Sequence, residues 1–403
     1  MSTADATVDD EVEAGSPRLD LLRRFIQGDL AELRVVLALA VIWLVFYLQE
    51  PRFMSSVNLS NLVLQTCAVG LVSIGIVHVL LLGEIDLSVG AVSGLCASIM
   101  AVLNVQHGWS PYLAIAAAVL AGTAIGLFQG SVFTRFAVPS FVVTLAGLLA
   151  WPGAQLKVLG ETGTINLNDP KILGLTNTFY SDTVGWIIAF VAIGVYGVLA
   201  LRGRQSRVAE GLAAPQLGLV VLRVALVSVA ILVAVWVLND DRGMPLAALI
   251  LVGFCLFFFY ITTRTTFGRH IFAVGGNAEA ARRAGINVTR VRVIVFVISS
   301  TMAAVGGIMA ASRLLAVNQS SGAGDFLLLA IAGPVIAGTS LFGGRGSVWH
   351  ALLGALVITS ISNGMDLLGL ETSIKFIVTG AVLLLAVVID AIARSQRQAA
   401  GRV

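Results

Sequence analysis

Charged side chains in or beside long apolar runs are the first candidates in this sequence for a functional role. They are Glu84, Asp86 and Lys375. A charge inside a membrane is costly, so each needs a functional role or a position at the end of a helix. For Glu84 and Lys375 we favour a helix end from which the side chain reaches the membrane surface. For Asp86, which lies beside a helix start, an N-cap or a salt bridge is as good an explanation as a helix end.

Two glycine-rich polar segments interrupt the apolar runs, and we call them the first break (residues 83–90, GEIDLSVG) and the second break (residues 338–347, GTSLFGGRGS). A similar string follows each, PSFVVTLAG at 139–147 and TSIKFIVTG at 372–380. Transport proteins often place their pathway between internal repeats. We therefore predict an internal repeat. The residues of the two breaks that stand out are Glu84, Asp86, Ser88, Gly90, Thr339, Ser340, Gly343 and Gly344.

The basic loop at 262–293 is the longest loop on its predicted side of the membrane and carries the signals of a short helix. Asn277 is a good N-cap, and Glu279 lies favourably in the first turn. Arg282 and Arg283 fall in the last turn, and Gly285 can end the helix. Such a helix suits insertion into a groove of a soluble partner. Spacing alone favours an ordinary solvent-exposed helix, with the docking helix as the alternative.

Nucleotide, metal and cofactor chemistry find no support in the residues. A phosphate-binding P-loop ends in Gly-Lys-Ser/Thr, whereas the lysines here, Lys157, Lys171 and Lys375, precede Val, Ile and Phe. The three cysteines lie in apolar stretches, as small buried hydrophobes do. We interpret His78 and His350 as packing residues. We therefore expect no enzymatic activity, no metal and no cofactor on this chain.

The elements that position these residues follow from composition, because 58% of the residues are hydrophobic, 12% are charged and the mean hydropathy is +0.95. Soluble domains carry about 25% charged residues. The sequence predicts an all-α integral membrane bundle of ten to twelve transmembrane helices, since each span needs roughly 20 apolar residues. The candidate spans are 33–49, 62–82, 88–105, 112–132, 139–153, 183–201, 219–238, 245–262, 293–312, 326–342, 347–365 and 373–393. Those beginning at 88, 139 and 326 are short, which favours tilted, broken or re-entrant segments.

The distribution of arginine predicts which loops face the cytoplasm, because cytoplasmic loops of membrane proteins are enriched in Lys and Arg. With the N-terminus inside, most arginines fall in cytoplasmic loops, including those at 202–207 and 262–293. The expected organisation is a cytoplasmic lead at 1–32, a transmembrane domain at 33–393 and a cytoplasmic tail at 394–403. Residues 1–32 lack the apolar core of a secretory signal. We expect a multi-pass protein with both termini cytoplasmic.

Taken together, the two breaks and the 262–293 loop resemble the monosaccharide branch of the ABC importer permeases over nearly the whole chain. Within that branch the sequence is most similar to xylose permeases, which share the extra helical pair bounded here by the Arg-rich 202–207 loop and by LNDDRGMP at 238–245. The chain departs from many relatives at Leu327, Leu328 and Leu329, where they carry acidic residues. Asp325 lies slightly earlier and is a candidate substitute for one of them.

The resemblance implies a permease homodimer in a bacterial inner membrane, a periplasmic sugar-binding protein and a cytoplasmic ATPase that binds ATP and Mg. It places ATPase coupling at Gly275, Gly276, Asn277, Glu279, Ala280, Arg282, Arg283 and Gly285. It also implies that the residues singled out in the two breaks lie near the translocation pathway or its cytoplasmic gate. Xylose is the expected substrate, with ribose or another small sugar as the alternative. An ion-coupled secondary transporter is a further alternative, although it would need ionisable residues at mid-membrane. We expect no nucleic-acid partner.

Overall fold

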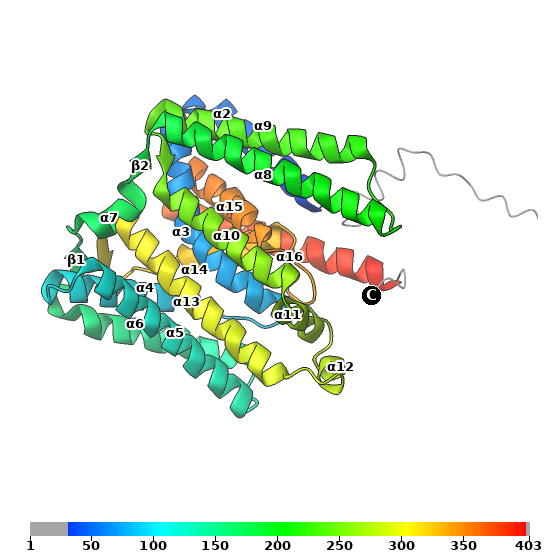
Figure 1. Ribbon diagram of the computed structural model, residues 1–403. Coiled ribbons are helices and arrows are strands. Elements are labelled where there is room, and N and C mark those ends of the chain that lie inside the picture. Colours follow the sequence, from blue (N-terminus) through cyan, green and yellow to red (C-terminus); the bar gives the residue numbers. More distant parts are fainter. Residues whose placement is uncertain (1–30, 400–403) are drawn as a thin grey trace, which may run out of the picture.

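The computed structural model describes residues 31–399. Residues 1–30 of the predicted lead and 400–403 of the predicted tail lie outside the described residues. Each predicted span corresponds to a helix (Figure 1). These helices are α2 (Ala31–Gln49), α3 (Ser56–Leu81), α4 (Val89–Ala101), α5 (Pro111–Arg135), α6 (Ser140–Leu159), α8 (Asp182–Ala209), α9 (Leu217–Asp241), α10 (Leu246–Arg264), α13 (Val288–Leu314), α14 (Asp325–Ile336), α15 (Trp349–Leu367) and α16 (Thr372–Ala399).

Membrane crossing is supported by length and composition. Within residues 31–399, eight helices are long and apolar enough to cross a membrane, with α4 counted together with the π-helical turn η2 (Val102–Gln106) that continues it. The apolar parts of α2, α14 and α16 are shorter. The chain is therefore a multi-pass, all-α membrane protein, as predicted, and the higher count of ten to twelve spans stays a prediction.

The three short predicted spans are irregular helices. α4 passes into the π-helical turn, α6 contains Pro152, and α14 has only 12 residues with Pro334 inside it. Proline removes a backbone donor and kinks a helix, which interrupts the regular part of α6 and α14. A helix of 12 residues is about 18 Å long, well short of the bilayer core.

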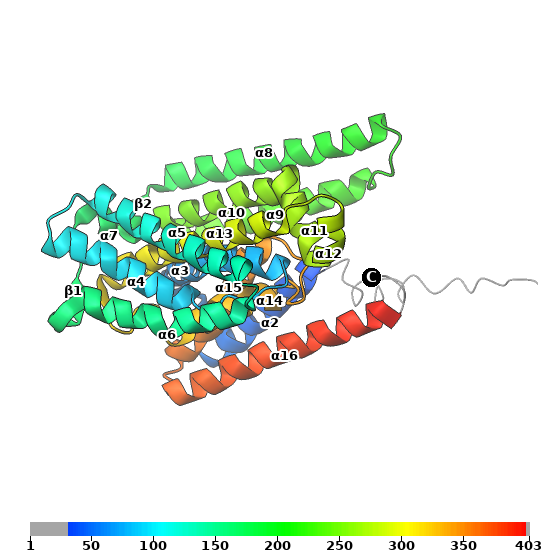
Figure 2. The same cartoon turned by 90° about the horizontal axis from the view of Figure 1, so that it is seen from below.

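The two ends of the bundle differ in what they carry (Figures 1 and 2). At one end, here the strand end, lie α7 (Pro170–Asn177), the 3₁₀ turn η3 (Gly160–Thr162) and two small antiparallel sheets. At the opposite end, here the α12 end, lie α11 (Thr266–Gly276) and α12 (Ala278–Arg283). The sheets pair β1 (Thr164–Asn166) with β4 (Ala316–Asn318) and β2 (Phe179–Tyr180) with β3 (Met244–Pro245), in the registers Ile165 to Val317 and Tyr180 to Met244.

Helix α3 lies at the centre of the bundle, and 89% of its apolar window is buried. It packs closely on α13 through small residues. A Cβ on Gly75 would lie 2.9 Å from the Ser299 backbone, and one on Gly306 would lie 2.9 Å from the Ala68 carbonyl oxygen. Lipid gives apolar helices no hydrophobic reason to associate, so close contacts of this kind hold membrane bundles together.

The hairpin of α8 and α9 lies at the edge of the bundle, as Figure 2 shows for α8. Only 11% of each apolar window is buried. Its contacts with the bundle gather toward the strand end, where Ala189, Val235, Leu238 and Met244 form a small core. Phe190 and Leu226, by contrast, are 63% and 62% exposed. This outward apolar surface suits contact with lipid.

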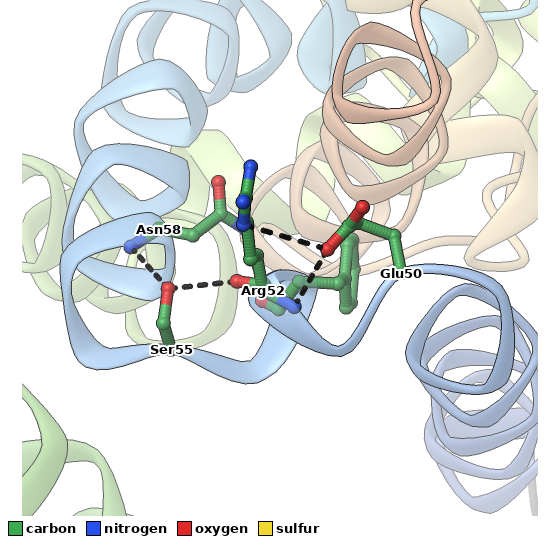
Figure 3. Close-up of polar contacts among 5 residues, drawn as sticks. Glu50, Arg52, Ser55 and Asn58 are labelled. Atoms are coloured by element: carbon green, nitrogen blue, oxygen red, sulfur yellow. Dashed lines mark hydrogen bonds and ion pairs between the residues drawn. The ribbon is translucent and has the colours of Figure 1, made fainter.

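Polar contacts fix the turn that joins α2 to α3 through the 3₁₀ turn η1 (Pro51–Met54), as Figure 3 shows. The Arg52 N–H donates to Glu50 Oε1 at 3.2 Å, and Ser55 Oγ donates to the Arg52 carbonyl oxygen at 2.7 Å. Ser55 Oγ also accepts from the Asn58 N–H and so caps α3. Asn58 Nδ2 donates to Asn363 Oδ1 at 2.9 Å, which ties the start of α3 to α15.

Candidate functional site

Helix α12 is short, exposed and capped at both ends, as its sequence predicts. Asn277 Oδ1 accepts from the Ala280 N–H at 2.9 Å. At the other end Gly285 has φ +85°, and its N–H donates to the Arg282 carbonyl oxygen while the Ile286 N–H donates to that of Ala281. This pair of bonds is the Schellman arrangement, which favours glycine at the position with positive φ.

The polar face of α12 is held by ion pairs within the helix. Glu279 pairs with Arg282 at 3.1 Å and with Arg283 at 3.2 Å. Of the six residues of α12, only Ala281 is buried. Glu279, Ala280, Arg282 and Arg283 all face solvent. Pairs this exposed contribute little stability, so this charged face is free to contact another protein.

Helix α11 carries α12 and was missed at the sequence level. Thr265 Oγ1 caps it by accepting from the Gly268 N–H at 3.2 Å. Ile271 and Val274 are fully or almost fully buried in the main core, and Phe267 packs against the same core. These three apolar residues, spaced four and three apart behind a threonine cap, are the signal that could have found the helix. Gly275 and Gly276, predicted to belong to the coupling segment, form its last turn.

The second break lies between the end of α11 and the first break. The Gly344 N–H donates to the Leu81 carbonyl oxygen at 2.9 Å, which joins the second break to the last residue of α3. Gly275 packs on the same carbonyl group, and Gly343 packs on Gly275 and Gly83. The fold therefore brings the predicted coupling segment and both predicted breaks into direct contact.

Glu84, in the first break, is held by two elements at the α12 end. Its Oε1 lies 2.9 Å from Arg292 Nη2 of α13, and its Oε2 accepts from Ser140 Oγ of α6 at 2.7 Å. The Arg292 guanidinium also lies over the Phe133 ring, 5.2 Å from its centroid. The charge of Glu84 is thus balanced by an ion pair and does not depend on reaching the membrane surface alone.

Asp86 is only 1% exposed and its carboxylate accepts three hydrogen bonds. Oδ1 accepts from the Ser88 N–H at 3.0 Å and from Ser88 Oγ at 2.7 Å, and Oδ2 accepts from Ser299 Oγ at 2.9 Å. Gln129 Nε2 donates to Ser88 Oγ at 3.0 Å. This network links α4, α5 and α13. Asp86 is not the N-cap of α4, because that position is Ser88; by accepting from the Ser88 N–H, Asp86 fixes the turn that leads into α4.

Gly90, the last predicted residue of the first break, lies in the first turn of α4. A Cβ there would lie 2.5 Å from the Gly322 carbonyl oxygen and 3.1 Å from the Leu327 Cβ. Leu327 is one of the three leucines at which the chain departs from its expected pattern. At this position an apolar side chain packs against the start of α4.

The second break folds back on itself. Thr339 and Ser340 are buried. Thr339 Oγ1 hydrogen-bonds His350 Nδ1 at 3.0 Å, and the Ser340 N–H donates to the Arg345 carbonyl oxygen. His350 is therefore a hydrogen-bonded packing residue, as predicted. Lys375 lies where the sequence placed it, at the start of α16, and pairs with Asp366 at the end of α15.

The two strings that suggested a repeat begin α6 and α16. Between break and string the first half has two long helices, α4 and α5, and the second half has one, α15. The likeness between the halves therefore extends to the breaks and these helix starts, and does not extend to the number of helices between them.

The family match and the similar proteins each cover most of the chain, and all of them are transport permeases. The family model described as branched-chain amino acid transport system / permease component matches residues 58–387. The xylose transport system permease protein XylH of Escherichia coli (strain K12) is 39% identical over 88% of this chain and 90% of its own length. The corresponding protein of Haemophilus influenzae is 36% identical over 88% and 95%, and the ribose import permease protein RbsC of Escherichia coli (strain K12) is 30% identical over 91% and 96%.

No solved structure matches the chain at a significant level. The family match covers most of the multi-pass bundle, including both breaks, α11 and α12. The chain belongs to the branched-chain amino acid transport system / permease component family, as a membrane-spanning permease subunit.

Proposed function

We propose that this chain is the permease subunit of an ATP-driven importer that brings xylose, or a closely similar pentose, into a bacterial cytoplasm. The named relatives support the substrate, because the xylose permeases are more similar to this chain than the ribose permease is. Selectivity in such a system rests largely on a periplasmic sugar-binding protein. The permease forms the translocation pathway, as a homodimer in the inner membrane.

The exposed face of α12 is the observation that carries this proposal. A capped, charged helix stands at one end of the bundle, and the helix that carries it, α11, contacts the second break, which in turn contacts the first break at Gly83. A soluble ATPase that bound α12 would therefore act directly on the segments next to the pathway. ATP and Mg belong to that partner, since the lysines of this chain lie outside any P-loop sequence.

Arginine placement supports a cytoplasmic location for the α12 end. α5 ends at Arg135, α8 carries Arg207 in its last turn and α10 ends at Arg264. These helix ends share an end of the bundle with α12 (Figure 1). Cytoplasmic loops are enriched in basic residues, so this end faces the cytoplasm and the strand end faces the binding protein. The N-terminal helix α2 and the C-terminal helix α16 then start and finish inside.

The mechanism that follows is alternating access. ATP binding closes the partner ATPases, which move α12 in both permease copies and open the paired pathway toward the binding protein. Hydrolysis resets the ATPases, and the pathway returns to face the cytoplasm. The permease needs only weak affinity for sugar, because the binding protein supplies the captured substrate.

An ion-coupled secondary transporter is the second candidate, and buried Asp86 is the observation that favours it. A carboxylate in an inaccessible part of a membrane protein is a common proton or sodium site. Against it, the three hydrogen bonds to Asp86 explain the carboxylate as a structural group that holds the turn before α4 against α13.

The test is affinity purification of the tagged chain in mild detergent, followed by reconstitution. We expect an ATPase with Walker motifs to co-purify, and we expect proteoliposomes holding the complex and its binding protein to accumulate xylose only with ATP. As a matched pair, Glu279→Lys should weaken retention of the ATPase, whereas Glu210→Lys, at the exposed end of α8, should not. If the chain purifies alone and accumulates sugar on a proton or sodium gradient, the secondary-transporter function is correct instead.

A further inference from the structure

We propose that Gly83, Gly275, Gly343 and Gly344 form a rigid backbone joint, here the glycine joint, that positions both breaks to move together with α12. The inference rests on the proposed function and deepens it, because it names the residues that carry movement from the docking helix to the pathway. The glycines come from three parts of the chain: the segment after α3, the last turn of α11 and the second break.

Gly275 occupies the tightest place in the joint. A Cβ at this position would lie 1.8 Å from the Leu81 carbonyl oxygen and 2.8 Å from the Gly344 backbone nitrogen. The Leu81 oxygen and the Gly344 nitrogen are themselves joined by the 2.9 Å hydrogen bond. Any side chain at 275 would have to push apart two backbone groups that bond to each other.

Gly343 closes the other side of the joint. A Cβ there would lie 2.6 Å from the Gly275 carbonyl oxygen and 2.9 Å from the Gly83 nitrogen. Gly83, Gly343 and Gly344 have φ values of +73°, +84° and +73°. Glycine is required here for two reasons, since both the backbone conformation and the lack of space disfavour a side chain.

Contact of backbone with backbone is what makes the joint rigid. Flexible side chains absorb a small displacement by changing rotamer, whereas close-packed main chain transmits it. α11 is anchored by buried Ile271 and Val274, and the single residue Asn277 separates it from α12. Movement of α12 therefore reaches the joint over a short connection.

The consequence is that both breaks receive the same displacement. The first break starts at Gly83, and the second break enters the joint through Gly343 and Gly344. The two segments nearest the pathway are thus coupled to one docking helix. The four glycines act as positioning residues, because they contact neither ATP nor sugar in this scheme.

Gly203, an exposed helical glycine of α8 outside the coupling segment, provides a matched control, since a Cβ at this position meets nothing within 4 Å. We compare Gly275→Ala with Gly203→Ala in the complete transporter, and measure ATPase retention and the number of ATP molecules hydrolysed per xylose imported. Gly275→Ala should retain the ATPase and raise the ATP cost of each xylose by about tenfold, within the usual range of coupling between sites. Gly203→Ala should match the unmodified protein. Equal ATP cost in all three proteins would overturn the inference.

A disulfide tests rigidity without depending on how Gly275→Ala folds. A Cβ on Gly344 would lie 3.2 Å from the Gly276 Cα, so a Gly276→Cys, Gly344→Cys pair is within disulfide reach. If the joint moves as one body, the oxidised pair should import xylose at the same rate as the same pair after reduction. Loss of import on oxidation, with recovery on reduction, would show that the segments separate and would refute the joint. Failure of the unmodified complex to import with ATP would instead refute the proposed function.

Discussion

Arg292 Nη2 and Glu84 Oε1 lie 2.9 Å apart and join the first turns of α13 to the first break. The side chains are 28% and 14% exposed, so the pair lies between a surface salt bridge and a fully buried one. Glu84 also accepts from Ser140, which adds α6 to the same contact. The pair therefore fixes the break against two helices at the end of the bundle that we assign to the cytoplasm.

We predict that Glu84→Gln lowers thermal stability and transport. Removing one partner of a partly buried pair leaves Arg292 uncompensated, at a cost of about 1 to 3 kcal/mol between the surface and buried limits. The measurement is the detergent melting temperature by intrinsic fluorescence. The charge-reversed double variant Glu84→Arg, Arg292→Glu should recover part of the loss. If the loss of melting temperature in the double variant equals the sum of the losses in the two single variants, the ion pair contributes nothing to stability.

We predict that Asn277→Ala weakens binding of the ATPase partner without unfolding the bundle. Loss of the hydrogen bond to the Ala280 N–H removes the N-cap of α12, which costs about 1 kcal/mol of helix stability. Asn277→Asp retains an acceptor oxygen and should bind the ATPase normally. The ATPase affinity of the detergent-solubilised permease is the quantity to measure. A defect in Asn277→Asp as large as that in Asn277→Ala would argue against capping as the cause.

The other end of α12 gives a prediction of its own. Gly285→Ala should also weaken ATPase binding, because φ is +85° and an alanine there costs about 1 to 2 kcal/mol. Space is not the cause, since a Cβ at Gly285 meets nothing within 4 Å. Gly285→Asn, which tolerates the left-handed region better, should bind the ATPase more tightly than Gly285→Ala. Hydrogen exchange of residues 278–286 should rise in the alanine variant, and unchanged exchange would contradict the explanation.

The parts of this structure that sequence predicts are those with local signals. Long apolar runs gave the membrane helices, and Asn277 with Gly285 gave α12, because caps act within one turn. α11 was missed since its apolar residues lie inside a basic loop that carries no long apolar run. The pairing of Glu84 with Arg292 joins residues 208 positions apart, and opposite charge alone does not select it. The glycine joint is also long-range, because three distant segments meet there and glycine spacing in one segment does not reveal the others.

Asp86→Asn separates the two candidate functions most directly. Asp86 accepts from two hydroxyl groups and one N–H, so its replacement by an amide puts an NH₂ group where a donor now points. At least one buried bond is lost, at a cost of about 1 to 3 kcal/mol. In an ATP-driven importer, this variant should melt at a lower temperature and retain ATP-dependent uptake at temperatures below its unfolding. In an ion-coupled transporter, the same variant would keep sugar exchange across the membrane but lose accumulation on an ion gradient. Uptake by Asp86→Asn vesicles with ATP alone, and then with a proton or sodium gradient alone, decides between these outcomes.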